Sequence, residues 1–196
     1  IHLAFLAYWA LAATLAWYLN WRPGIHLSAL ALIFWFVINY DGIQKMLGWS
    51  EAEVLTIYIL LPLAIWSACQ VFESSANALT MTIGHYAFFF FLGAFAVLHL
   101  PDTGERGPMP SWLAFAGAMS AISIAAVFAS LQRKGSTVID VLGTLFACLV
   151  TASYVILVGK GEDTYDVFYL VCTLIVIIWS ISRGARLDDR FVINLS

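Results

Sequence analysis

Histidine is the residue type in this sequence that best suits chemistry, and two of the four histidines lie on one apolar stretch. His85 and His99 are near the two ends of residues 84–100, GHYAFFFFLGAFAVLHL. On a helix their separation of fourteen residues is about 3.9 turns, so both rings leave nearly the same face, about 21 Å apart. Imidazole is an axial ligand of haem iron. The stretch therefore predicts either a plain membrane helix or one that can hold a tetrapyrrole near each end.

The other two histidines give each of these rings a candidate partner. With the orientation that the loop charges indicate, His26 lies with His85 towards the cytoplasmic leaflet. His2 lies with His99 towards the outer leaflet. The spacing of His85 and His99 is similar to that on a ligating helix of b-type cytochromes; this resemblance covers one helix and two residues and implies haem ligation and electron transfer. The alternative is that the four histidines hydrogen-bond to headgroups or loop carbonyls at the membrane interface.

A second group of polar residues follows the third apolar run. Gln70, Glu73, Ser74 and Asn77 lie in one short segment on the same predicted side of the membrane as His85. They could line a polar vestibule for a small substrate, with Glu73 and His85 exchanging a proton. The alternative is a solvated turn between two membrane spans.

Motifs for enzymatic chemistry are missing from the sequence. It has no serine–histidine–acid arrangement, no HExxH, no P-loop and no GxGxxG. The last apolar run lacks the lysine that a retinal Schiff base needs, and no apolar run carries a charged residue near its middle, as a proton- or sodium-driven transporter normally does. The three cysteines lie in apolar runs without metal-ligand spacing: Cys69, Cys148 and Cys172. We predict no catalytic residue and no metal site, which favours a protein that is not an enzyme.

The composition is that of an integral membrane protein. Hydrophobic residues make up 62% of the 196 residues and charged residues 11%, and the mean hydropathy is +0.90. Soluble domains are about 45–50% apolar and about 25% charged. The net charge of −3 argues against a nucleic acid partner. We predict one transmembrane domain, residues 1–196, with no separate soluble domain.

Seven apolar runs are long enough to cross a bilayer as helices. They cover residues 3–18, 25–40, 54–72, 79–100, 112–131, 138–158 and 167–182. The predicted fold class is thus all-α, a polytopic bundle of about seven transmembrane helices. Asp41-Gly42 is predicted to end the second helix, and residues 43–49 to form a short amphipathic turn at the interface.

Three helix starts carry capping signals. Ser50 and Glu53 form a capping box in which each side chain is expected to bond the backbone N–H of the other. Ser111 is predicted to cap the fifth helix. Thr137 followed by Asp140 resembles a capping box with a shorter acid, and we interpret Asp140 as a helix-start acid favoured by the helix dipole.

The charges of the loops predict the orientation. With seven spans, six basic residues fall on one side: Arg22, Arg133, Lys134, Arg183, Arg186 and Arg190. The other side has three basic residues and eight acids. By the positive-inside rule the first side is cytoplasmic, which places the N-terminus outside and the C-terminus inside a bacterial-type plasma membrane. The chain begins at Ile1 and not at methionine, and we expect it to be truncated at one or both ends.

Small residues at four-residue spacing predict close helix contacts, either within the bundle or with a partner subunit or second copy. Ala114 with Ala118 and Gly117 with Ala121 give two such registers on the fifth helix. Gly143, Ala147 and Thr151 give another on the sixth. The function we predict is a non-catalytic subunit or scaffold in a larger membrane complex. The alternatives are a haem- or tetrapyrrole-binding electron-transfer protein and a channel or carrier for a neutral solute or lipid.

Overall fold

A computed structural model describes residues 2–19, 21–72, 78–96, 110–131, 137–157 and 164–187, and these residues form eight α-helices. The helices are α1 (His2–Tyr18), α2 (Arg22–Ile38), α3 (Tyr40–Leu47), α4 (Glu51–Phe72), α5 (Ala78–Ala96), α6 (Pro110–Leu131), α7 (Val138–Leu157) and α8 (Thr164–Leu187). The predicted all-helical bundle is confirmed. The seven expected apolar runs correspond to every helix except the short α3.

Four of the described helices are long and apolar enough to cross a membrane. They lie in α4, α6, α7 and α8, and the bent pair of α2 and α3 gives a fifth if it counts as one span. Ala4–Tyr18 and Thr80–Ala96, within α1 and α5, are shorter apolar helices. Four to five long apolar helices are the mark of a membrane protein, because about twenty apolar residues are needed to cross the hydrocarbon core.

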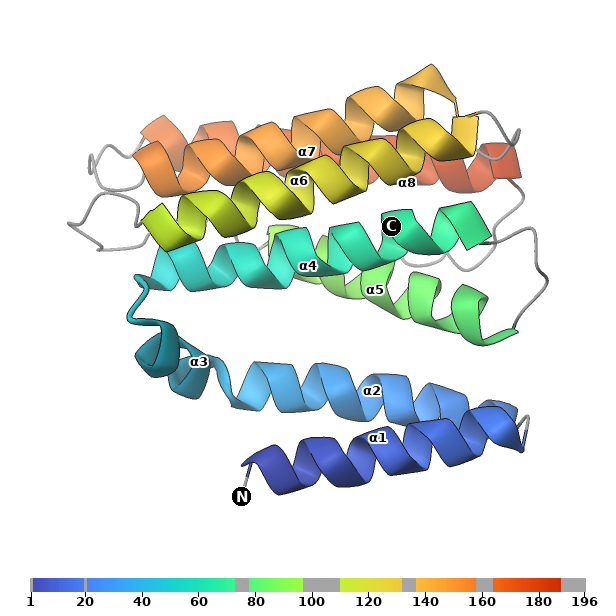
Figure 1. Ribbon diagram of the computed structural model, residues 1–196. Coiled ribbons are helices and arrows are strands. Elements are labelled where there is room, and N and C mark those ends of the chain that lie inside the picture. Colours follow the sequence, from blue (N-terminus) through green and yellow to red (C-terminus); the bar gives the residue numbers. More distant parts are fainter. Residues whose placement is uncertain are drawn as a thin grey trace.

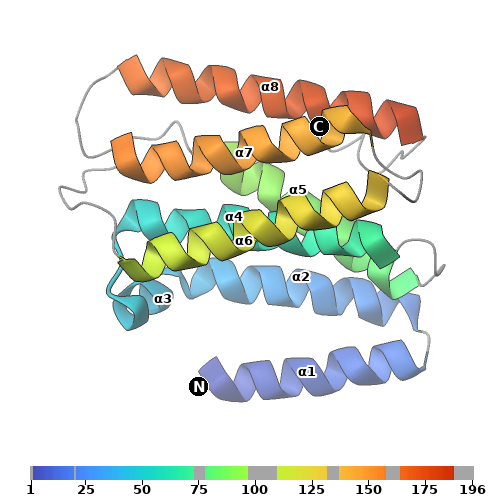
Figure 2. The ribbon, with the colours of Figure 1, turned by 45° about the horizontal axis from the view of Figure 1, so that its top comes forward.

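The long helices alternate in direction and lie side by side (Figure 1). The α1–α2 hairpin, blue in the figure, forms one side of the bundle and α7 with α8 forms the other. α4 is at the centre and contacts α5, α6, α7 and α3, whereas the main neighbour of α1 is α2 alone. Accordingly, 61% of the apolar window of α4 is buried, against 22% of that of α6. The second view shows the same order of layers (Figure 2).

The start of α4 confirms the predicted capping box. The backbone N–H of Ser50 donates to Glu53 Oε2 at 2.8 Å, and the N–H of Glu53 donates to Ser50 Oγ at 3.3 Å. These bonds satisfy two N–H groups that a helix start leaves without a partner. The prediction for Ser111 is wrong: α6 begins at Pro110, a residue favoured at the first helical position, and Ser111 Oγ instead accepts a bond from Trp49 Nε1 at 3.0 Å.

The end of α2 also differs from the prediction. Asp41 and Gly42 lie inside α3, and the chain turns at Asn39, where α2 and α3 meet at 60°. The side-chain Nδ2 and the backbone N–H of Asn39 both donate to the carbonyl of Trp35, at 2.8 and 3.0 Å, so the side chain adds a second bond at the end of α2. α3 is amphipathic, with exposed Asp41 and Lys45, as expected for the predicted interfacial segment.

The two predicted sets of small residues face different ways. On α7, Ala147 and Thr151 are fully buried, and Gly143 packs against the indole ring of Trp179 on α8. On α6 the small residues are exposed: Ala114, Gly117, Ala118 and Ala121. The register on α7 therefore serves the bundle itself, whereas the register on α6 lies on its outer face.

Candidate functional site

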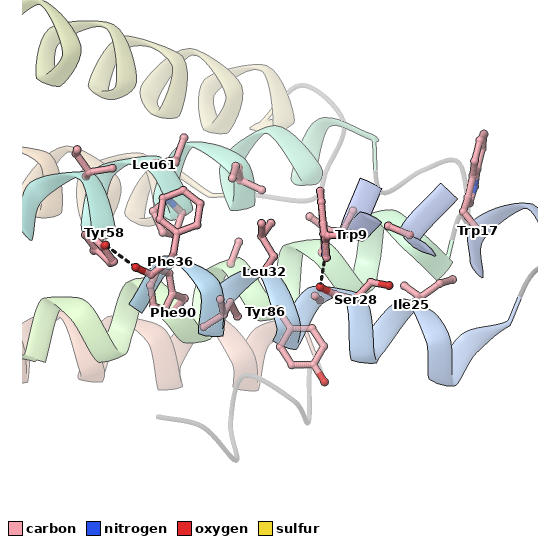
Figure 3. Close-up of a pocket in the computed structure, with 18 of the residues that line it drawn as sticks. Trp9, Trp17, Ile25, Ser28, Leu32, Phe36, Tyr58, Leu61, Tyr86 and Phe90 are labelled. Atoms are coloured by element: carbon pink, nitrogen blue, oxygen red, sulfur yellow. Dashed lines mark hydrogen bonds between the residues drawn. The ribbon is translucent and has the colours of Figure 1, made fainter. Parts of the chain in front are cut away.

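A cavity lies between the α1–α2 hairpin and the central helices α4 and α5. It has a volume of about 400 Å³ (Figure 3). We call it the hairpin pocket. Its lining residues come from four helices: Trp9, Ala13, Thr14 and Trp17 of α1; Ile25, Ser28, Ala29, Leu32, Ile33 and Phe36 of α2; Ile57, Tyr58, Leu61, Pro62 and Ile65 of α4; and Ile83, Tyr86, Ala87 and Phe90 of α5. Most are aliphatic or aromatic, so the wall is apolar.

Four polar side chains of the wall donate hydrogen bonds to backbone carbonyls: Trp9, Thr14, Ser28 and Tyr58. Trp9 Nε1 donates to the carbonyl of Ser28 at 2.6 Å, and Ser28 Oγ donates to the carbonyl of Gly24 at 2.8 Å. Thr14 Oγ1 donates to the carbonyl of Ala10 at 2.7 Å. Because these donors already bond backbone carbonyls, the wall suits a ligand that binds by apolar contact and makes few hydrogen bonds.

One end of the hairpin pocket is closed by aromatic rings. The hydroxyl of Tyr58 on α4 donates to the carbonyl of Phe36 on α2 at 2.7 Å, so a hydrogen bond joins the hairpin to the bundle here (Figure 3). The rings of Phe36 and Tyr58 are edge-on, with their centres 5.9 Å apart. The ring centres of Phe90 and Tyr58 are 5.8 Å apart. Tyr40 of α3 is also packed on Tyr58, at 5.5 Å. α3 thus helps to seal this end.

The other end of the hairpin pocket reaches the surface. Four residues of its wall are more than a third exposed: Thr14, Trp17 (53%), Ile65 (37%) and Ile83 (38%). They belong to α1, α4 and α5, in the halves of these helices that lie away from α3 (Figure 1). The hairpin pocket is therefore blind at the end near α3 and open near the connection between α1 and α2.

A second site is a buried cluster of charged residues that joins α4, α7 and α8. Asp140, in the first turn of α7, is 1% exposed and lies between two arginines of α8. Arg183 Nη1 is 3.3 Å from Asp140 Oδ2, and Arg186 Nη2 is 2.7 Å from Asp140 Oδ1. Arg183 Nη2 also donates to Gln70 Oε1 of α4 at 2.5 Å, and its guanidinium lies 4.8 Å from the ring centre of Trp66. We call this group the Asp140 cluster.

The start of α7 is built into the Asp140 cluster. The N–H of Thr137 donates to Asp140 Oδ2 at 2.7 Å, which is one of the two bonds of the predicted capping box, whereas the N–H of Asp140 donates to the backbone carbonyl of Thr137 and not to its hydroxyl. Arg186 Nη1 donates to Thr137 Oγ1 at 2.6 Å. Asp140 thus accepts hydrogen bonds from Thr137 at its own helix start and from Arg186, and it forms an ion pair with Arg183. The role of the cluster is structural: it holds α4, α7 and α8 together.

The predicted histidine site is described only in part. His99 and the side chain of His2 lie outside the described residues. The ring of His26 is exposed and meets the ring of Tyr86 edge-on at 5.7 Å, whereas His85 is half-buried and lines a small pocket with Cys69 and Gln70. Within the described part of the chain, no group of three or more His, Cys, Asp or Glu side chains could hold a metal ion. Haem binding stays a prediction, and a Soret band in the purified protein is its test.

Of the four residues of the predicted vestibule, the structure describes Gln70 alone. Gln70 is half-buried at the end of α4 and accepts a bond from Arg183. Glu73, Ser74 and Asn77 lie outside the described residues. Sequence reasoning misses the partners of Gln70 and Asp140, because the apolar run ends at residue 182 and leaves Arg183 outside the predicted helix. The usable signal was the spacing of Arg183 and Arg186, which puts both on one face if the helix continues.

Comparisons with protein-family models, with curated proteins and with solved structures find no match to this chain.

Proposed function

We propose that this chain is a multi-pass membrane protein that holds a lipid-like apolar molecule in the hairpin pocket, as a non-catalytic subunit or scaffold of a cell membrane. The observation that carries the proposal is the pocket itself: about 400 Å³, walled by apolar side chains, within the 300–1,000 Å³ typical of small-molecule sites. Four of its polar wall side chains donate to the protein backbone, which favours hydrocarbon as the occupant. This develops the lipid carrier among the functions that the sequence allows.

Two neighbouring alanines of α1 provide a matched test. Ala13 lines the pocket, whereas Ala12 is exposed and outside its wall. Ala13→Phe should fill the space and expel the occupant, and Ala12→Phe adds the same side chain towards the lipid. We expect native mass spectrometry in mild detergent to detect bound lipid on the wild type and on Ala12→Phe, and little on Ala13→Phe. Equal occupancy in the two variants, or none in the wild type, would contradict the proposal.

We propose the orientation that the sequence predicts, with the N-terminus outside and the connection between α1 and α2 in the cytoplasm. The charges of the described helices support it. Arg22, Arg183 and Arg186 lie at one end of the bundle, and Asp41, Glu51 and Glu53 lie at the other with Lys45. The excess of arginine at the first end is typical of a cytoplasmic surface.

Cysteine labelling tests this orientation directly. In a background in which the three native cysteines are replaced by alanine, a membrane-impermeant maleimide added to intact cells should label Lys45→Cys and spare Arg22→Cys. The reverse pattern would invert the orientation. Labelling of both residues only after the cells are opened would also exclude it.

The outer face of α6 supports the role as a subunit. Ala114, Gly117, Ala118 and Ala121 are exposed, and no atom outside the local backbone lies within 4 Å of a Cβ built on Gly117. In a bilayer, small residues let two helix backbones approach closely. We propose oxidative crosslinking of Gly117→Cys in the cysteine-free background. It should give a disulfide-linked homodimer if the partner is a second copy of this chain, and a crosslinked product of this chain with a different protein if the partner is another subunit. Leu149→Cys on the exposed face of α7 is the control. Gly117→Cys that stays uncrosslinked would contradict a contact at this face.

A further inference from the structure

The shape of the hairpin pocket indicates how its occupant would enter. The pocket is sealed near α3 by Phe36, Tyr58 and Phe90 and opens near Trp17 at the end of α1. A rod-shaped molecule would therefore insert one end into the pocket and leave the other at the level of the α1–α2 connection. An amphiphile with one apolar chain and one polar end fits this asymmetry. A ligand that is apolar throughout would not place a polar group at the open end.

The length of the pocket fits a chain from one leaflet. On α2 its wall runs from Ile25 to Phe36, and eleven residues of helix rise about 16 Å. The hydrocarbon core of a bilayer is about 30 Å thick, so one leaflet supplies chains of about half that depth. A single acyl chain that enters at the open end would reach the ring of Phe36 at about the depth where its own leaflet ends.

The residues at the open end are those of a membrane surface with a positive charge. Arg22 is exposed and precedes Ile25 by three residues, which puts it on the same side of α2 and one turn nearer the surface. The first turn of α2 contains no acidic residue. His26 is exposed beside Tyr86, a residue of the pocket wall. Trp21 packs its ring on Gly24, and tryptophan at a helix end is typical of the headgroup level.

We infer that the occupant is an anionic phospholipid of the cytoplasmic leaflet, with one acyl chain in the hairpin pocket and its phosphate beside Arg22. The inference rests on the proposed function, and it adds the class of the ligand and the residue that selects it. A basic residue near an anionic leaflet contributes about 1 kcal/mol, or roughly a fivefold preference. The apolar wall can hold any acyl chain, so the pocket determines how much lipid is bound. Arg22 determines which headgroup is preferred.

The test uses the purified full chain reconstituted in vesicles of phosphatidylcholine with one fifth phosphatidylglycerol, then extracted in mild detergent for native mass spectrometry. The wild type should carry phosphatidylglycerol enriched roughly fivefold over its share of the vesicle. Arg22→Gln should carry as much lipid in total without this enrichment, and Arg22→Lys should keep it. Lys45→Gln, which removes a basic residue at the opposite end of the bundle, should leave it unchanged.

The outcomes separate this inference from the proposed function. Equal enrichment in the wild type and in Arg22→Gln would overturn the choice of Arg22, and a wild type that binds both lipids in their vesicle ratio would overturn the anionic class. In both cases the pocket would still hold lipid. Loss of all lipid from Ala13→Phe supports the pocket, whereas an unchanged amount and ratio of lipid in Ala13→Phe would overturn the proposed function and this inference with it.

Discussion

Asp140 on α7 and Arg183 on α8 form an ion pair with both side chains almost completely buried, at 1% and 3% exposure. They come from helix ends that meet, the first turn of α7 and the last turns of α8. Asp140 also accepts from the backbone of Thr137 at the start of its own helix, and Arg183 donates to Gln70 of α4, a third helix. The pair therefore fixes the position of α4, α7 and α8 relative to one another at one end of the bundle.

Removing Arg183 should destabilise the bundle strongly. Arg183→Ala leaves the buried Asp140 with only Arg186 as its cationic partner and takes a donor from Gln70, and breaking a buried pair in this way costs about 3–5 kcal/mol. Arg186→Ala should cost about 1 kcal/mol, since this side chain is 34% exposed. Thermal unfolding in detergent, followed by circular dichroism, measures both. A loss from Arg186→Ala as large as that from Arg183→Ala would show that the buried pair is not the main contact.

The Asp140 cluster also marks where prediction from the sequence ends. The capping role of Asp140 follows from its position three residues after Thr137, and the structure has that bond. Its two arginine partners lie more than forty residues away along the chain. Only the packing of α7 on α8 brings them together, and local patterns contain no information on that packing. The predicted end of the last helix at residue 182 also hid the fact that α8 continues through Arg183 and Arg186 to Leu187.

Two glycines of similar appearance in the sequence should respond oppositely to alanine. A Cβ on Gly143 would overlap the indole ring of Trp179, whereas a Cβ on Gly117 meets open space. Overpacking costs about 1–3 kcal/mol, so Gly143→Ala should lower the unfolding temperature. Gly117→Ala should leave it unchanged or raise it, because alanine favours the helix by up to about 1 kcal/mol. Gly143→Leu should enlarge the loss. Equal effects at the two sites would contradict the packing of α7 on α8.

The hairpin pocket could not be predicted from the sequence. Helix positions were predicted well, because long apolar runs between turn residues are a strong signal. In a membrane helix, however, residues that face lipid and residues that face a cavity are equally apolar. Leu32 lines the pocket and Leu30 is exposed, yet nothing in their types or spacing separates them. Only the arrangement of four helices, with α1 packed on α2 and α2 on α5, creates the space.

Tyr58→Phe should loosen the α1–α2 hairpin without disturbing the rest of the bundle. The variant keeps the aromatic ring between Phe36 and Phe90 and removes only the hydroxyl that donates to the carbonyl of Phe36, a bond worth about 1 kcal/mol. Hydrogen exchange should become faster in α2 and α3, while α7 and α8 stay as protected as in the wild type. Retention of lipid should fall, because the closed end of the pocket depends on this bond. Tyr8→Phe, at a side chain that is 75% exposed on α1, is the matched control and should change neither quantity. Faster exchange in α7 and α8, or no change in α2, would contradict the role of Tyr58 as the bond between hairpin and bundle.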